Sequence, residues 1–159
     1  MHIKAYQDIP QEKFQSIKRI LDKSPMLEFL RVEVELLSPG FARIRIPFRQ
    51  EFLQSFGVVQ GGIIATAGDT AAGIAFLTLL KQSEILLTVD LKINFLAPVK
   101  NSDIFSECKI IHKGSLISLG EFEVKTSAGT LVAKGITTLT SKVKKGIVKN
   151  SLLNYGVLV

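Results

Sequence analysis

Residues 61–80 read GGIIATAGDTAAGIAFLTLL, and Asp69 is the only charged residue among them. Twenty mainly apolar residues are long enough for a membrane span, for a plain core helix, or for a core helix that carries a functional acid. A span is disfavoured because an aspartate at the bilayer centre costs about 2.5 to 3.5 kcal/mol on insertion scales. Strand-like patterns on both sides of the stretch also favour a core helix.

Two features make this predicted helix unusual. It contains four glycines, Gly61, Gly62, Gly68 and Gly73. Glycine weakens a helix by up to about 1 kcal/mol relative to alanine, so these residues indicate close approach of backbone, sheet or ligand. Aspartate is a poor helix former that is seldom buried without a partner. Asp69 is therefore either a packing residue that accepts a hydrogen bond from Thr88 or another donor, or a functional carboxylate.

The segments before residue 61 follow regular patterns. Helical spacing predicts a helix over residues 9–23, with Pro10 near its first turn and Ser24-Pro25 ending it. Alternating apolar and charged residues predict a β-hairpin of strands 32–36 and 42–48, with cross-strand ion pairs between its acidic and basic residues. Residues 49–59 are expected to form a loop.

Four strand-like segments follow the central helix, at residues 85–96, 104–112, 116–126 and 130–141. A hairpin and a four-strand meander around one long apolar helix favour an antiparallel sheet that curls around that helix. This is an α+β architecture, the hotdog fold, with an additional N-terminal helix. We expect a single domain over residues 1–142 and a C-terminal tail over 143–159, where Lys142, Lys144, Lys145 and Lys149 cluster.

The composition narrows the classes of partner. The chain is 47% apolar with a formal net charge of +6, and its mean hydropathy of +0.31 is high for a soluble monomer. These values favour apolar surface shared between subunits and an anionic partner such as a phosphate-bearing cofactor. The absence of tryptophan and the scattered phenylalanines do not support a nucleic-acid interface.

Cys108 is the only cysteine, which excludes an internal disulfide. No secretory signal pattern opens the sequence, so we expect a cytoplasmic protein. Cys108 lies in a strand-like run without an activating partner, and we interpret it as a structural cysteine. His2 and His112 lack metal-ligand spacing, so neither a metal nor a cofactor is expected.

Two motifs resemble one family. GVVQGGIIATAGDTAAGIA at residues 57–75 is similar to the signature of PaaI-like hotdog acyl-CoA thioesterases, of the phenylacetate-pathway type, and TVDLKINFLAPVK at 88–100 resembles the strand that follows it. The resemblance extends over residues 33–140. It implies that Asp69 is the catalytic carboxylate, that the Gly61 N–H contributes to the oxyanion hole, and that Thr88 supports the site. Gln54 stands where the family has asparagine, and Gln60 where it has histidine.

The helical rise predicts an intersubunit site. Asp69 follows Gly61 by eight residues, which places it about 12 Å further along the helix, too far to act on the same carbonyl. Gly61 and Gln54 of one chain must then meet Asp69 and Thr88 of another, as the resemblance also implies. We expect a homodimer or a dimer of dimers, without membrane insertion.

The predicted activity is hydrolysis of an aryl- or fatty-acyl-CoA thioester. Asp69 acts either as a general base on water or as a nucleophile, and the sequence does not separate the two. Gln60 and Gly62 are expected to contact the substrate. A noncatalytic acyl-CoA- or lipid-binding protein is the alternative, in which the replacements at Gln54 and Gln60 have removed efficient turnover; unlike the family's histidine, Gln60 cannot titrate near neutral pH. A dehydratase is less favoured, since its chemistry calls for a histidine.

Lys113-Gly114-Ser115, at a strand junction, resembles the family's turn on the phosphate side of CoA, although an ordinary exposed β-turn is an equal interpretation. The depth of the acyl pocket is expected to depend on how Phe56, Phe76, Leu80 and the partner's strands pack, which the sequence does not specify.

Overall fold

The structure is a computed structural model that describes residues 2–143. A seven-stranded sheet has the strand order β1-β2-β3-β5-β6-β7-β4. All neighbouring strands are antiparallel except β1 and β2. The strands are β1 (His2–Ile3), β2 (Glu33–Ser38), β3 (Phe41–Ile46), β4 (Glu84–Phe95), β5 (Ile104–Lys113), β6 (Ser118–Thr126) and β7 (Leu131–Val143). The helices are α1 (Gln11–Leu21), α2 (Pro25–Leu30) and α3 (Gly61–Leu77), with a 3-10 turn η1 (Gln50–Phe52).

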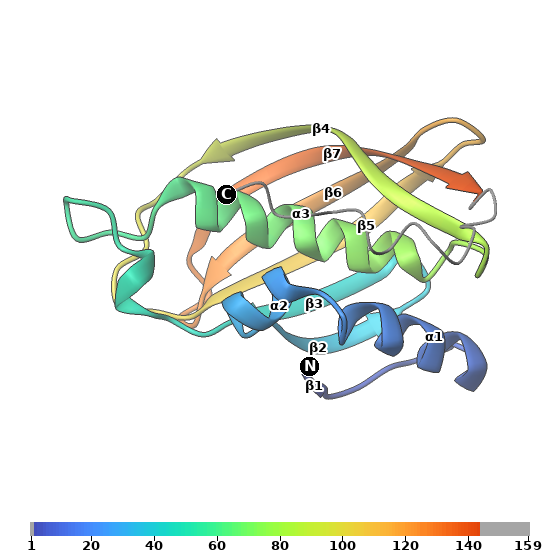
Figure 1. The fold of residues 1–159 in the computed structure, drawn as a ribbon. Coiled ribbons are helices and arrows are strands. Elements are labelled where there is room, and N and C mark those ends of the chain that lie inside the picture. The colour runs from blue at the N-terminus through green and yellow to red at the C-terminus, as the bar shows by residue number, and fades with distance from the viewer. Residues whose placement is uncertain (1, 144–159) are drawn as a thin grey trace, which may run out of the picture.

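The sheet curls around α3, which confirms the predicted hotdog fold (Figure 1). The helix contacts β3, β4, β5, β6 and β7. Its small residues permit this close packing: a Cβ added to Gly68 would lie 2.3 Å from the ring of Phe122, and one added to Gly135 of β7 would meet the same ring. Gly68 and Gly135 thus form the slot that holds Phe122 between helix and sheet.

The N-terminal region differs from the prediction in one respect. Ser24-Pro25 was expected only to end a helix, but a second helix, α2, begins at Pro25. The Ser24 hydroxyl accepts a hydrogen bond from Leu27 N at 3.5 Å, and Pro25 occupies the first helical position, where a missing N–H costs nothing. The interpretation of Ser24-Pro25 as a stop alone is therefore wrong.

The predicted four-strand meander is also wrong in part. Only β5, β6 and β7 follow one another in the sheet, whereas β4 lies beyond β7 at the edge. Residues 96–103 carry the chain from this edge back to β5 beside β3, a distance that a tight turn does not cover. The consequence is a 12-residue strand that, among residues 2–143, has a partner on one side only.

The expected ion pairs of the first hairpin are confirmed at Glu33 and Arg45, whose side chains lie 3.0 Å apart on paired residues. Arg45 also binds Asp103 at 2.7 Å, and Arg43 pairs with Glu107 of β5 instead of with β2. The charged pairs therefore extend over three strands.

Two further findings bear on the predictions. Among residues 2–143, no helix combines the length and apolar character that a membrane span requires. The predicted tail lies, apart from Val143 at the end of β7, outside the residues that the structure describes.

Candidate functional site

The beginning of α3 presents backbone donors. Gln60 occupies the N-cap position with φ −56° and ψ 131°, and its side chain does not cap the helix. The N–H groups of the first helical residues cannot reach an intrahelical acceptor. The Gly61 and Gly62 N–H groups point from the positive end of the helix dipole, which suits a developing negative charge.

An apolar groove adjoins these donors. It has a volume of about 330 Å³ and is lined by Val59, Gly61, Ile64, Phe95, Leu96, Ala97 and Pro98. The ring of Phe95, at the end of β4, lies 3.3 Å from the position of a Cβ added to Gly61. None of the described residues that line the groove is charged, so it suits an uncharged apolar group placed beside the helix N-terminus.

The residues expected to affect the depth of the acyl pocket do not line this groove. Phe76 and Leu80 are buried in the core, and Phe56 is 88% exposed at a loop tip. Phe95 and Leu96 line this groove, and because they adjoin α3 only in the folded chain, the sequence did not single them out. Their occurrence in the motif at residues 88–100 was the one available signal.

Asp69 lies two turns further along α3, half-buried. Its Oδ1 accepts a hydrogen bond of 2.9 Å from the Thr88 hydroxyl on β4. This contact joins two residues that the sequence analysis assigned to the site. Because β4 is an edge strand, the pair lies at the open side of the sheet.

Gln54 lies in the loop between η1 and α3. Its Oε1 accepts a hydrogen bond of 2.8 Å from Phe56 N, and its backbone bonds to Val58 and Gly57 close a tight turn. Gly57 has φ +73°, which glycine adopts without strain. The side-chain oxygen of Gln54 is thus engaged within its own loop, and Gln60 beside α3 is exposed.

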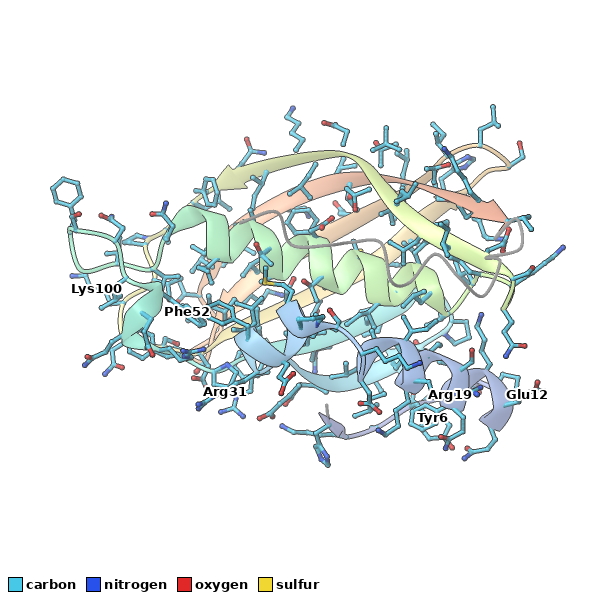
Figure 2. All side chains as sticks on the ribbon, viewed as in Figure 1. Tyr6, Glu12, Arg19, Arg31, Phe52 and Lys100 are labelled. Atoms are coloured by element: carbon cyan, nitrogen blue, oxygen red, sulfur yellow. The ribbon has the colours of Figure 1, made fainter. Side chains whose placement is uncertain are left out.

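The turn Lys113-Gly114-Ser115 joins β5 to β6 at the opposite end of α3. Gly114 N donates to Ile117 O at 2.9 Å, and a Cβ on Gly114 would lie only 2.6 Å from that oxygen. Figure 2 shows these two ends of the molecule: Phe52 and Lys100 lie where α3 begins, and Glu12 and Arg19 lie beyond its other end. Within a single chain, this turn and Gly61 therefore lie at opposite ends of α3.

Cys108 is buried in β5, in agreement with the structural role expected for it. Burial raises the pKa of its thiol to about 12, and the charge of Glu121 contributes in the same direction. The thiol is neutral at physiological pH and is not a nucleophile.

Known proteins are similar to this chain in sequence and in fold. A family profile described as the thioesterase superfamily matches residues 56–133. A protein of Saccharolobus solfataricus named as a putative esterase is 37% identical over 79% of this chain and 90% of its own length. A second, from Halobacterium salinarum and named in the same way, is 33% identical over 74% of this chain and 81% of its own.

Solved structures agree on the fold. A thioesterase family protein from Silicibacter pomeroyi superimposes with a TM-score of 0.78 at 22% identity, over 82% of this chain and 98% of that one. The E. coli PaaI protein of the phenylacetic acid degradation operon gives 0.76 at 16% identity, over 84% and 95%. The chain therefore belongs to the family of these putative esterases, with a match to the thioesterase superfamily over residues 56–133, and it has the hotdog fold.

Proposed function

We propose that the protein hydrolyses an acyl-CoA thioester, with Asp69 as the catalytic carboxylate. The observation that carries the proposal is the hydrogen bond from Thr88 to Asp69, which holds a carboxylate in an otherwise uncharged helix. Thr88 donates to one oxygen, Oδ1, which leaves Oδ2 to accept a proton from water.

The reaction requires oxyanion donors as well as the carboxylate. In the proposed step, water attacks the thioester carbon, Asp69 takes the water proton, and the carbonyl oxygen becomes negative beside the Gly61 N–H. Collapse of this intermediate breaks the C–S bond and releases the CoA thiolate, to which the proton returns. Direct attack by Asp69, followed by hydrolysis of the resulting anhydride, is the other course.

A second copy of the chain completes the site. Gly61 and Asp69 lie about 12 Å apart along one helix. In the described part of the chain, one edge of β4 has no partner strand, and Val89 on this strand is 60% exposed. We propose that two copies pair antiparallel through this edge about a two-fold axis.

The direction of β4 brings the required groups together. It starts near the end of α3, where Glu84 N bonds to Lys81 O, and finishes at Phe95 beside Gly61. Antiparallel pairing places the start of one β4 beside the end of the other. Gly61 of one chain then faces the half of the partner that carries Asp69 and Lys113.

The same arrangement fits the substrate. The acyl group occupies the apolar groove beside Gly61, and the CoA phosphates extend toward the partner's Lys113-Gly114-Ser115 turn. The net charge of +6 favours such an anionic ligand.

Release of free thiol from aryl-, short-chain and long-chain acyl-CoA tests the proposal. Wild type should hydrolyse at least one class, and Asp69→Asn should lose nearly all turnover while it stays oligomeric. Glu12→Gln, an exposed carboxylate change on α1, is the matched control and should behave as wild type. An Asp69→Asn protein with wild-type turnover contradicts the proposal. Tight acyl-CoA binding by wild type without thiol release indicates the noncatalytic alternative.

A further inference from the structure

A β-bulge lies directly beside the Asp69–Thr88 pair. On β4, Thr88 is paired with Leu139 of β7, but the next pair is Asp90 with Thr138, so Val89 is an extra residue. A bulge of this kind bends the strand, increases its twist and turns the neighbouring side chains. The direction of the Thr88 hydroxyl therefore depends on the shape of this bulge.

Thr137 of β7 contacts the bulge from inside the core. Its hydroxyl donates to the backbone oxygen of Asp90 at 3.2 Å. The side chain is completely buried and is one of three fully buried polar residues in the part of the chain that the structure describes. Gly120 on β6 leaves room for it, since a Cβ there would lie 3.2 Å from the Thr137 methyl group.

Packing alone does not account for a threonine at this position. Valine has nearly the same shape and would fill the same space without a buried hydroxyl, which is unfavourable to desolvate unless it is hydrogen-bonded. The acceptor that Thr137 uses belongs to the residue directly after the bulge.

We propose that Thr137 is a positioning residue for the thioesterase site. Its bond to Asp90 O fixes the bulge in the form that directs the Thr88 hydroxyl to Asp69. The inference rests on the proposed function of Asp69 and deepens it, because it identifies a residue that touches neither substrate nor carboxylate and still sets the rate.

The first test is kinetic. Thr137→Val should lower kcat by roughly threefold to tenfold, the range spanned by one net hydrogen bond, with little change in KM. Thr137→Ser, which restores the hydroxyl, should recover kcat. Thr140→Val is the matched control, because it removes a hydroxyl on the same strand whose bond, to Leu116 O at 2.7 Å, lies away from the bulge. Should the valine variant fail to fold, Thr137→Ala removes the same hydroxyl with less bulk.

A double-mutant cycle separates positioning from simple packing. In a Thr88→Val background, Thr137→Val should have no further effect on kcat, because the residue through which it acts is gone. The same fold loss in both backgrounds, or an unchanged kcat in Thr137→Val, overturns the inference.

A structural readout keeps the two proposals distinct. In a crystal structure of Thr137→Val, the distance from Thr88 Oγ1 to Asp69 Oδ1 should exceed the 2.9 Å of the native chain. This holds whether or not the protein cleaves acyl-CoA. Absence of turnover in wild type therefore refutes the proposed function, whereas an unchanged distance refutes the role of Thr137.

Discussion

The hydroxyl of Thr88, on the edge strand β4, donates to Oδ1 of Asp69 in the central helix at 2.9 Å. This contact links the helix to the strand at the edge of the sheet that residues 2–143 form. The orientation of the carboxylate and the proposed pairing of two chains therefore depend on the same strand.

Loss of the Thr88 hydroxyl should reduce turnover. In Thr88→Val we expect kcat to fall by about tenfold, because the hydrogen bond to a charged carboxylate is worth roughly 1.5 to 3 kcal/mol and only part of it acts in the transition state. Thr88→Ser should retain most activity. Steady-state thiol release provides the measurement, and equal kcat values for Thr88→Val and wild type would contradict the assigned role.

Phe95 should limit the size of the acyl group. Its ring lines the groove beside Gly61, so Phe95→Ala enlarges the groove and should shift the preference, as kcat/KM, toward bulkier or longer acyl-CoA by about tenfold. Phe56→Ala removes the same ring from an exposed loop tip and should leave the preference unchanged. Identical acyl profiles for Phe95→Ala and wild type would show that the groove does not hold the acyl group.

A charge on the free edge of β4 should break the oligomer. Val89→Lys places two lysines near the proposed two-fold axis, and edge lysines oppose strand pairing. Sedimentation should show monomers, and activity should fall with the oligomer. Ile136→Lys, on β7 and 45% exposed, is the matched control and should stay oligomeric. A fully active, oligomeric Val89→Lys protein would exclude this interface.

Asp103 should contribute stability that depends on pH. Burial alone would raise the pKa of its carboxyl, but the hydrogen bonds from Phe48 N and Arg45 outweigh burial and hold the pKa below its usual value of 3.8. The unfolded chain therefore binds this proton first as the pH falls, so the contribution is present above about pH 4 and is lost below it.

Asp103→Asn should lower the free energy of unfolding at pH 7 by about 1 to 2 kcal/mol. The difference from wild type should shrink toward pH 3. Urea unfolding at both values provides the measurement, with Glu12→Gln as an exposed control. A difference that stays constant with pH would show that the charge of Asp103 is not what stabilises this region.

Much of the fold could be predicted because helices and strands leave periodic patterns in neighbouring residues of the sequence. The hydrophobic periodicity indicated α3, the alternation of charged and apolar residues indicated β2 and β3, and Asp69 was conspicuous as the single charge in its helix. The capping of α2 was missed because Ser-Pro is compatible both with the end of one helix and with the start of another.

The features of the fold and site that were not predicted depend on the order of the strands in the sheet, which the sequence pattern alone does not specify. The edge position of β4 follows from its pairing with β7, some fifty residues later. The groove arises because Phe95, at the far end of that strand, returns to Gly61. For the same reason the contact of Thr137 with the bulge could not be read from the sequence, whereas Thr88 was named as a possible donor to Asp69.

The central claim, that each site combines two chains, can be tested by mixing two inactive variants. Asp69→Asn lacks the carboxylate. Gly61→Pro lacks the N–H, and proline is tolerated at the first helical position, particularly after Gln60, whose ψ of 131° suits a residue before proline. A Cβ at this position would lie 3.3 Å from the ring of Phe95, a half-exposed side chain that can shift.

Dimers that contain one chain of each variant can be isolated by co-expression with two affinity tags. A shared site predicts one intact site per dimer, formed by Gly61 of the first variant and Asp69 of the second, and therefore about half of the wild-type turnover per dimer. Each variant alone should be nearly inactive. Mixed dimers that are as inactive as their parents, from chains that otherwise fold and pair, would contradict the account.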